Sequence, residues 1–192
     1  DDARTLGFEG MADTFQVIDQ GDHCLVRLIR AGAAGDDSDW DGVYEDVTEG
    51  WLAFLTQLRF AVERHPGQPR RTIYLSGKPA EGQAPALPRA RLGADTLNTV
   101  AEGGAYTLDP GFGEALSGQV WRRSRRQLAL TVGAYGDGLV LVSDHSNGGG
   151  SVIVTTYGLS DAAFQALREG WTSWWREAFP SASAVTATEA AY

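Results

Sequence analysis

The tripeptide Glu-Gly-Trp occurs twice in this chain, at residues 49–51 and at residues 169–171. The surrounding apolar residues align at the same offset without a gap: Tyr44 with Phe164, Val47 with Leu167, Phe54 with Trp174 and Leu55 with Trp175. A recurring apolar register indicates two copies of one structural unit, because the buried face of a unit is what its repeats share. This repeat constrains the fold more than any other feature of the sequence.

The first copy predicts two β-strands followed by a long helix. Residues 14–20 and 23–30 have the alternating or β-rich pattern of paired strands with a turn at Gly21-Asp22. Apolar residues from Tyr44 to Val62 then recur at helical spacing. Pro66-Gly67 ends this amphipathic helix.

The second copy repeats this order. Residues 139–143 and 151–157 are predicted strands that flank a turn rich in Asn and Gly. A helix capped by Ser160 follows, and Pro180 ends it. Its aromatic stripe repeats the spacing of the first helix.

The middle of the chain is less regular. It predicts a short strand at residues 71–76, a Pro-rich loop at residues 78–88, and three further strands. Consecutive strands with short turns favour an α+β class with antiparallel sheets over a parallel sheet. The expected organisation is a strand-and-helix unit at 1–68, a linker with a short strand and helical turns at 69–100, a second strand-and-helix unit at 101–180 and a flexible tail at 181–192.

The first copy carries a family resemblance in residues 14–19 (Thr-Phe-Gln-Val-Ile-Asp), residues 24–28 and residues 49–58. This pattern resembles the C-terminal half of a START-like, or SRPBCC, domain, and most closely the bacterial homologues of the activator of heat-shock-protein ATPase. The resemblance covers residues 8–66, with residues 115–179 as a weaker second copy. The family's opening strand and two short helices have no counterpart here, which implies that a further segment precedes Asp1.

The resemblance implies a helix-grip fold, in which an antiparallel sheet curves around a long helix and encloses an apolar cavity. It also implies a cytoplasmic, non-catalytic protein that binds a small hydrophobic ligand. Other members of the family catalyse cyclisation, so a cyclase-like enzyme and a chaperone or protein-interaction module are the alternatives. The expected ligand-binding residues lie on the two helices: Trp51, Phe54, Leu55, Leu58, Trp171, Trp174 and Trp175.

Each of these helices has a glycine directly before its tryptophan, Gly50 and Gly170. A glycine inside a helix costs about 1 kcal/mol relative to alanine. Two explanations remain open: close packing of the helix backbone on a sheet, or space left beside the tryptophan for a ligand.

No constellation in the sequence predicts a catalytic residue, a metal ligand set or a cofactor. Asp144-His145-Ser146 are chain neighbours, and a triad needs side chains that converge from separate supports. The three histidines lack metal-ligand spacing. Cys24 lies in an apolar run and is expected to be buried and inert. An enzyme would have to use polar groups on the strands, for which the candidates are Asp19, Arg27, Tyr157 and Asp144.

Charge limits the partners. The net charge of −9 at pH 7 disfavours nucleic acids and anionic membranes, and Arg122-Arg123-Ser124-Arg125-Arg126 is the only basic run. No apolar stretch reaches 18 residues, so no membrane span is expected. The partner that the resemblance implies is a small apolar molecule, and a protein partner or a homodimer is left open.

Overall fold

The computed structural model describes residues 3–7, 13–30, 40–79, 87–179 and 186–190. The chain divides into two compact units, Asp1–Asp41 and Gly42–Tyr192. The first unit is a sheet of three antiparallel strands in the order β1 (Arg4–Gly7), β2 (Thr14–Asp19) and β3 (Cys24–Ile29). The predicted β2–β3 hairpin is confirmed. Cys24, however, is exposed, because it opens β3 directly after the turn, so the prediction of a buried thiol was wrong.

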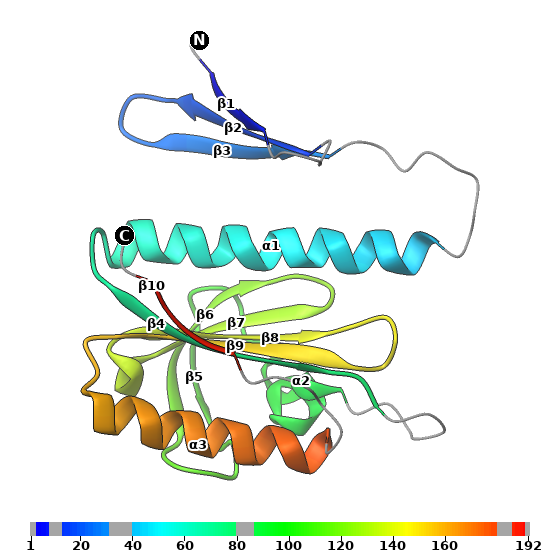
Figure 1. The fold of residues 1–192 in the computed structure, drawn as a ribbon, viewed down its shortest axis with the longest axis vertical. Helices are drawn as coiled ribbons and strands as arrows, with labels where there is room; N and C mark the ends of the chain where they lie inside the picture. Colours follow the sequence, from blue (N-terminus) through cyan, green and yellow to red (C-terminus); the bar gives the residue numbers. More distant parts are fainter. Residues whose placement is uncertain (1–2, 8–12, 31–39, 80–86, 180–185, 191–192) are drawn as a thin grey trace. The chain divides into compact units, whose positions relative to one another are not determined.

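The second unit is an α+β structure around one antiparallel sheet (Figure 1). Its seven strands are arranged in the order β10-β4-β9-β8-β7-β6-β5. The elements are α1 (Trp40–Arg64), β4 (Arg70–Gly77), α2 (Pro88–Arg91), η1 (Ala94–Leu97), β5 (Ala105–Leu108), β6 (Leu116–Arg123), β7 (Gln127–Val132), η2 (Gly133–Tyr135), β8 (Gly138–Asp144), β9 (Gly150–Tyr157), α3 (Asp161–Ala178) and β10 (Thr186–Ala190).

The two long helices, α1 and α3, cover opposite faces of this sheet (Figure 1). Strand β8 shows the division, because its side chains alternate between the faces. Val140 and Val142 belong to the core that contains the α3 tryptophans. Leu139 and Leu141 pack with Phe60 of α1 instead. Burial on both faces explains why β8 is a continuous apolar run in the sequence.

Strand β4 connects distant parts of the chain. It pairs with β9 along its whole length, from Arg70 opposite Tyr157 to Gly77 opposite Gly150. The short strand and the helical turns expected within residues 69–100 correspond to β4, α2 and η1, and β4 is an inner strand of the sheet rather than part of a linker. Part of the expected flexible tail is also ordered, because β10 pairs with the other side of β4.

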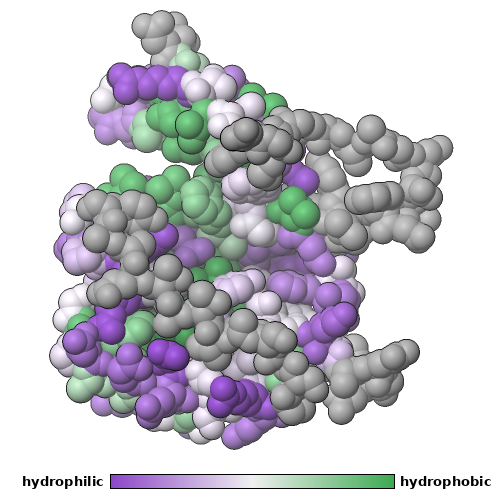
Figure 2. Space-filling view, in the orientation of Figure 1, coloured by the Kyte–Doolittle hydropathy of each residue, from purple (hydrophilic) through white to green (hydrophobic). Residues whose placement is uncertain are grey.

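Helix α1 packs on the sheet through a face that the aromatic stripe does not define. Ala53 and Phe60 are buried against the sheet, at 7% and 0% exposure. Phe54 and Val62 of the predicted stripe are 45% and 60% exposed. Figure 2 shows hydrophobic atoms gathered along this part of α1. The helix thus has two apolar faces. The periodicity of the sequence predicted the more aromatic face to be buried, whereas the face with Ala53 and Phe60 packs on the sheet. No helix within the described ranges is both long and apolar enough to cross a membrane.

Candidate functional site

An open groove of about 450 Å³ lies between α3, η2 and the connection from β5 to β6. Most of its lining is apolar, and Glu114 and Tyr135 supply the polar groups. The lining residues are Phe112, Gly113, Glu114, Ala134, Tyr135, Leu159, Ala163, Ala166, Leu167 and Gly170. This size and composition match those of small-molecule sites, which are commonly 300–1,000 Å³.

The N-terminus of α3 is fixed where it forms one wall of the groove. The Ser160 hydroxyl accepts a hydrogen bond from the Ala163 backbone N–H at 3.3 Å, as the predicted cap requires. Asp161 lies in the first turn, where the helix dipole favours a negative charge. Arg71 of β4 donates to Asp161 at 2.7 Å, and its guanidinium lies 3.9 Å from the centre of the Phe164 ring. These contacts hold α3 to the sheet.

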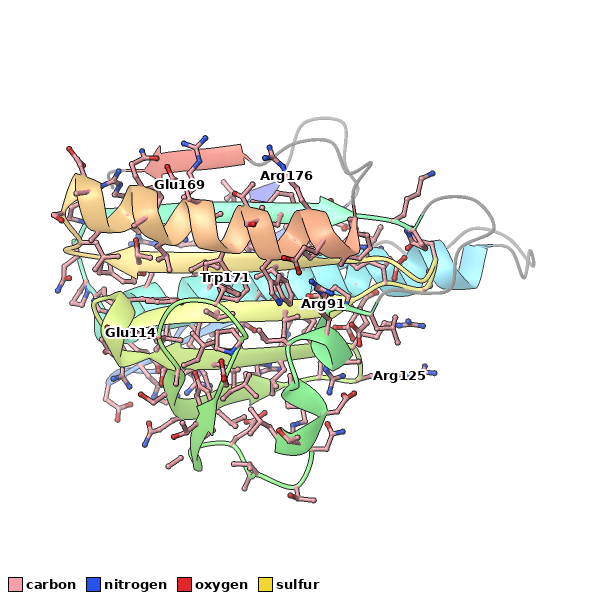
Figure 3. The ribbon with its side chains drawn as sticks, turned by 90° about the horizontal axis from the view of Figure 1, so that it is seen from below. Arg91, Glu114, Arg125, Glu169, Trp171 and Arg176 are labelled. Carbon is pink, nitrogen blue, oxygen red and sulfur yellow. The ribbon has the colours of Figure 1, made fainter. Side chains whose placement is uncertain are left out.

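Trp171 lies beneath the groove. Its side chain is fully buried, and its indole N–H donates to the Tyr135 hydroxyl over 3.3 Å. The Phe112 ring meets the Trp171 ring edge-on, with centroids 5.0 Å apart. In Figure 3, Trp171 points from α3 toward the sheet, and Glu114 and Arg91 lie on opposite sides of it. Trp171 therefore supports two lining residues from below.

Two buried tyrosines, Tyr106 and Tyr135, belong to the same core as Trp171. The Tyr106 hydroxyl donates to the Thr131 carbonyl at 2.8 Å. Burial, together with the Glu114 carboxylate, raises the pKa of Tyr135 to about 12, although its bond to Trp171 opposes the shift. Tyr135 is therefore protonated at neutral pH. Its hydroxyl accepts from Trp171, but its own proton has no acceptor within the described part of the chain.

The raised pKa of Tyr135 predicts a loss of stability at alkaline pH. Below pH 10 the tyrosine is protonated in both the folded and the unfolded chain, so its full contribution is present. Between pH 10 and about 12 the unfolded chain loses this proton first, and we expect the free energy of unfolding to fall by about 2–3 kcal/mol.

Urea unfolding at pH 9 and pH 11.5 measures this loss. The Tyr135→Phe variant should lose less stability between the two pH values than the wild-type chain does. Equal losses in both proteins would show that Tyr135 does not carry the effect.

The two repeat glycines differ in their surroundings. A Cβ placed on Gly170 would lie 3.1 Å from Cδ2 of Phe112, so the Phe112 ring packs closely on the helix backbone there. A Cβ placed on Gly50 would meet nothing within 4 Å, and Gly50 is exposed. Close packing thus accounts for Gly170 but not for Gly50.

This difference predicts opposite effects of alanine. Gly50→Ala should stabilise the chain by about 1 kcal/mol, because alanine is the better helix former and the new methyl group has open space. Gly170→Ala should gain less or destabilise, because the Phe112 ring has to move. Urea unfolding of both variants measures the two changes in the free energy of unfolding. Equal changes would contradict the difference in packing around the two glycines.

None of the seven ligand-binding residues predicted from the sequence lines the groove. Trp171, Trp174 and Trp175 are buried in the core beneath α3. Trp51, Leu55 and Leu58 are half-buried on α1, beside the exposed Phe54. Their contact with a ligand stays a prediction.

The lining aromatics Phe112 and Tyr135 were not singled out from the sequence. Phe112 directly follows the predicted turn at residues 109–111, and Tyr135 lies between a predicted strand that ends at Ala134 and the predicted turn at residues 136–138. A large aromatic residue beside a short turn was the available signal, because loops carry binding residues disproportionately.

Two other hollows fit a site less well. The larger one, of about 660 Å³, is lined only by outward side chains of α3, among them Glu169 and Arg176 in Figure 3. A single helix gives it one wall. Between α1 and the sheet there is a cavity of only about 10 Å³, which is too small for more than a single water molecule.

Of the polar candidates for catalysis, Asp144 and Tyr157 lie at opposite ends of the paired strands β8 and β9 in the second unit. Asp144 accepts from the backbone N–H of Arg89 at 3.1 Å, where α2 begins, and burial raises the pKa of this carboxyl. The neighbouring Ser146 instead bonds to Asp46 of α1. Asp19 and Arg27 are exposed on the three-stranded sheet.

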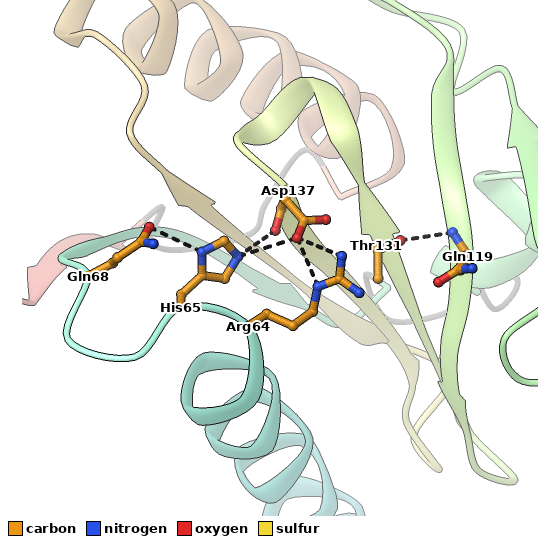
Figure 4. Close-up of polar contacts among 6 residues, drawn as sticks. All are labelled: Arg64, His65, Gln68, Gln119, Thr131 and Asp137. Atoms are coloured by element: carbon orange, nitrogen blue, oxygen red, sulfur yellow. Dashed lines mark hydrogen bonds and ion pairs between the residues drawn. The ribbon is translucent and has the colours of Figure 1, made fainter.

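Tyr157, the fourth candidate, belongs to the joint between α1 and the sheet. Its ring stacks on His65 with centroids 3.6 Å apart. The imidazole Nε2 lies 2.8 Å from the Asp137 carbonyl oxygen, and Arg64 bonds to the Asp137 carboxylate (Figure 4). Gly136 completes this turn at a φ of +72°, against the Tyr157 carbonyl. This cluster therefore fixes the C-terminus of α1.

The basic run also has a structural role at its centre. The Arg123 guanidinium donates to the carbonyl groups of Leu97, Asn98 and Val100, at the C-terminal end of η1. For the side chains that the structure describes, no group of three or more His, Cys, Asp or Glu could hold a metal ion.

Comparison with known proteins yields no relative: no family model, no curated protein and no solved structure matches this chain. The chemistry of the groove is therefore the basis on which a function can be inferred.

Proposed function

We propose that this protein binds a small, mainly apolar molecule in the groove between α3, η2 and the β5–β6 connection. The observation that carries the proposal is the groove itself. Its volume is about 450 Å³, and its largely apolar lining includes one tyrosine and one glutamate. Apolar surface supplies affinity in such sites, and a few polar groups orient the ligand.

The topology of the second unit agrees with this proposal. Its first strand pairs with the last strand before α3, and α3 then packs on one face of the sheet. We propose that residues 70–179 are a START-like domain of the helix-grip type. This range is longer than residues 115–179, which the sequence repeat indicated as the second copy. An apolar site beside the last helix is expected in that class.

Binding rather than catalysis is the function that this lining favours. Among the described residues, Glu114 and Tyr135 are the only titratable side chains that line the groove, and Tyr135 keeps its proton at neutral pH. General acid–base chemistry needs a group whose pKa lies near the working pH. Among the other polar candidates, Asp144 accepts from Arg89 and the Tyr157 ring stacks on His65. Asp19 and Arg27 belong to the three-stranded sheet of the other unit.

Titration with N-phenyl-1-naphthylamine, an uncharged probe whose fluorescence rises in apolar surroundings, tests the proposal. We expect saturable binding to the wild-type chain and at least a tenfold loss in Ala163→Trp, because the new ring fills the groove. Ala162→Trp is the matched control, because Ala162 is the exposed neighbour on α3 and does not line the groove. Binding that both variants retain, or that neither retains, would contradict the groove as the site.

A further inference from the structure

We infer that the groove selects uncharged ligands that carry a hydrogen-bond acceptor and rejects ligands with a carboxylate or sulfonate group. This inference rests on the proposed function, because it specifies what the same groove binds. Two features carry it: the Glu114 carboxylate, which forms no ion pair with a described residue, and the Tyr135 hydroxyl proton, which has no acceptor among the described residues.

Glu114 sets the charge preference. It is the only charged residue among the described residues that line the groove. Within the described ranges, no Arg or Lys forms an ion pair with it, although Arg64, Arg71 and Arg91 are paired elsewhere. Glu114 is exposed at the groove wall, and a carboxylate without a counter-charge repels an anion about 4 Å away by about 1 kcal/mol, or about fivefold in affinity, even in water. The net charge of −9 adds to this repulsion at longer range.

Tyr135 sets the preference for an acceptor. Its hydroxyl oxygen is held in place by the Trp171 N–H, and its proton has no acceptor in the described part of the chain. A ligand carbonyl or ether oxygen can accept this proton on binding. A purely hydrocarbon ligand would cover the hydroxyl and leave its donor buried and unpaired, which costs free energy, so the groove discriminates against it.

A matched pair of probes tests the charge preference. N-phenyl-1-naphthylamine and 1-anilinonaphthalene-8-sulfonate share one ring system and differ by the sulfonate. We expect the wild-type chain to bind the uncharged probe more tightly. Glu114→Gln should tighten sulfonate binding about fivefold and change binding of the uncharged probe less than twofold.

Glu169→Gln is the control variant. It removes the same charge from an exposed position on α3 that does not line the groove. It should leave the binding of both probes within twofold of wild type. If Glu114→Gln and Glu169→Gln tighten sulfonate binding equally, net charge and not the groove is responsible, and the inference is wrong.

A second ligand pair tests the acceptor preference. 2-Acetylnaphthalene and 2-isopropylnaphthalene have similar shapes, and only the first carries a carbonyl. In displacement of N-phenyl-1-naphthylamine, we expect the ketone to bind about fivefold tighter to the wild-type chain. Tyr135→Phe should abolish this preference, with its near-ultraviolet circular dichroism checked for folding. A wild-type chain that prefers the hydrocarbon would overturn this half of the inference, whether or not the variant folds.

The possible outcomes distinguish failure of the proposed function from failure of the proposed ligand selectivity. Failure of the wild-type chain to bind N-phenyl-1-naphthylamine removes the proposed function and this inference with it. Saturable binding that Ala163→Trp blocks, with equal affinity for the sulfonate in wild type and Glu114→Gln, overturns the charge selectivity alone. The proposed function would stand in that case.

Discussion

Replacing Trp171 with alanine should lower the free energy of unfolding by about 3–5 kcal/mol, whereas Trp51→Ala should cost about 1 kcal/mol. The two tryptophans share the tripeptide Glu-Gly-Trp, so their local sequence is matched. Trp171 is fully buried and contacts Phe112, Trp174 and the Tyr135 hydroxyl. Trp51 is only half-buried, so its removal leaves a smaller cavity.

Urea unfolding followed by far-ultraviolet circular dichroism measures both costs without relying on tryptophan fluorescence. Trp171→Phe provides an intermediate variant, because it keeps an aromatic ring but loses the hydrogen bond to Tyr135. Similar costs for the two alanine variants would show that the repeat copies are buried alike, contrary to the packing seen in the structure.

Gly136→Ala should be the second strongly destabilising change, at about 3–5 kcal/mol. Gly136 has a φ of +72°, a region that an alanine occupies at a cost. A Cβ at this position would also overlap the carbonyl oxygen of Tyr157, which belongs to the strand beside the turn. The methyl group can be accommodated only if the backbone of the turn or of β9 moves.

Gly67→Ala separates these two causes. Gly67 has nearly the same φ, +71°, but a Cβ there would meet nothing within 4 Å. Its replacement should therefore lower the free energy of unfolding only by the cost of placing alanine in a left-handed backbone conformation, about 1–2 kcal/mol. Thermal and urea unfolding of both variants give the comparison, and equal losses would mean that the contact with Tyr157 adds nothing.

Much of the second unit could be predicted from the sequence because its signals are local. The stripe of α3 buries Phe164, Trp171, Trp174 and Trp175, as expected for one apolar face on a sheet. The Ser160 cap and the strands around the Asn-Gly turn are also where the pattern placed them. Local chemistry fixes these elements, so a single sequence contains the information.

The orientation of α1 could not be predicted in the same way. Its sequence has two apolar faces, and which of them packs on the seven-stranded sheet depends on distant residues. The Gln127 side chain donates to the Glu49 carbonyl, and Ser124 donates to the Glu49 carboxylate at 2.6 Å. Both partners are more than 70 residues away, as the sequence shows. Helical periodicity carries no information about such contacts.

The groove was missed for a related reason. Phe112 and Tyr135 lie in separate connections, and only the strand order of the sheet brings them together beside Gly170. Pairing of β4 with β9 was equally hidden, because strand pairs far apart in the chain leave no local mark. Sequence patterns thus predicted the elements, whereas tertiary pairing decided the site.

The position of β4 has a consequence for synthesis on the ribosome. β4 is the first strand of its sheet to be translated, yet its two partners are β9 at residues 150–157 and β10 at residues 186–190. Pairings of such long range have a high contact order and form slowly. Until β9 emerges, both edges of β4 expose unpaired backbone groups that another chain can join. The yield of correctly folded protein should therefore depend on what shields this strand in the nascent chain.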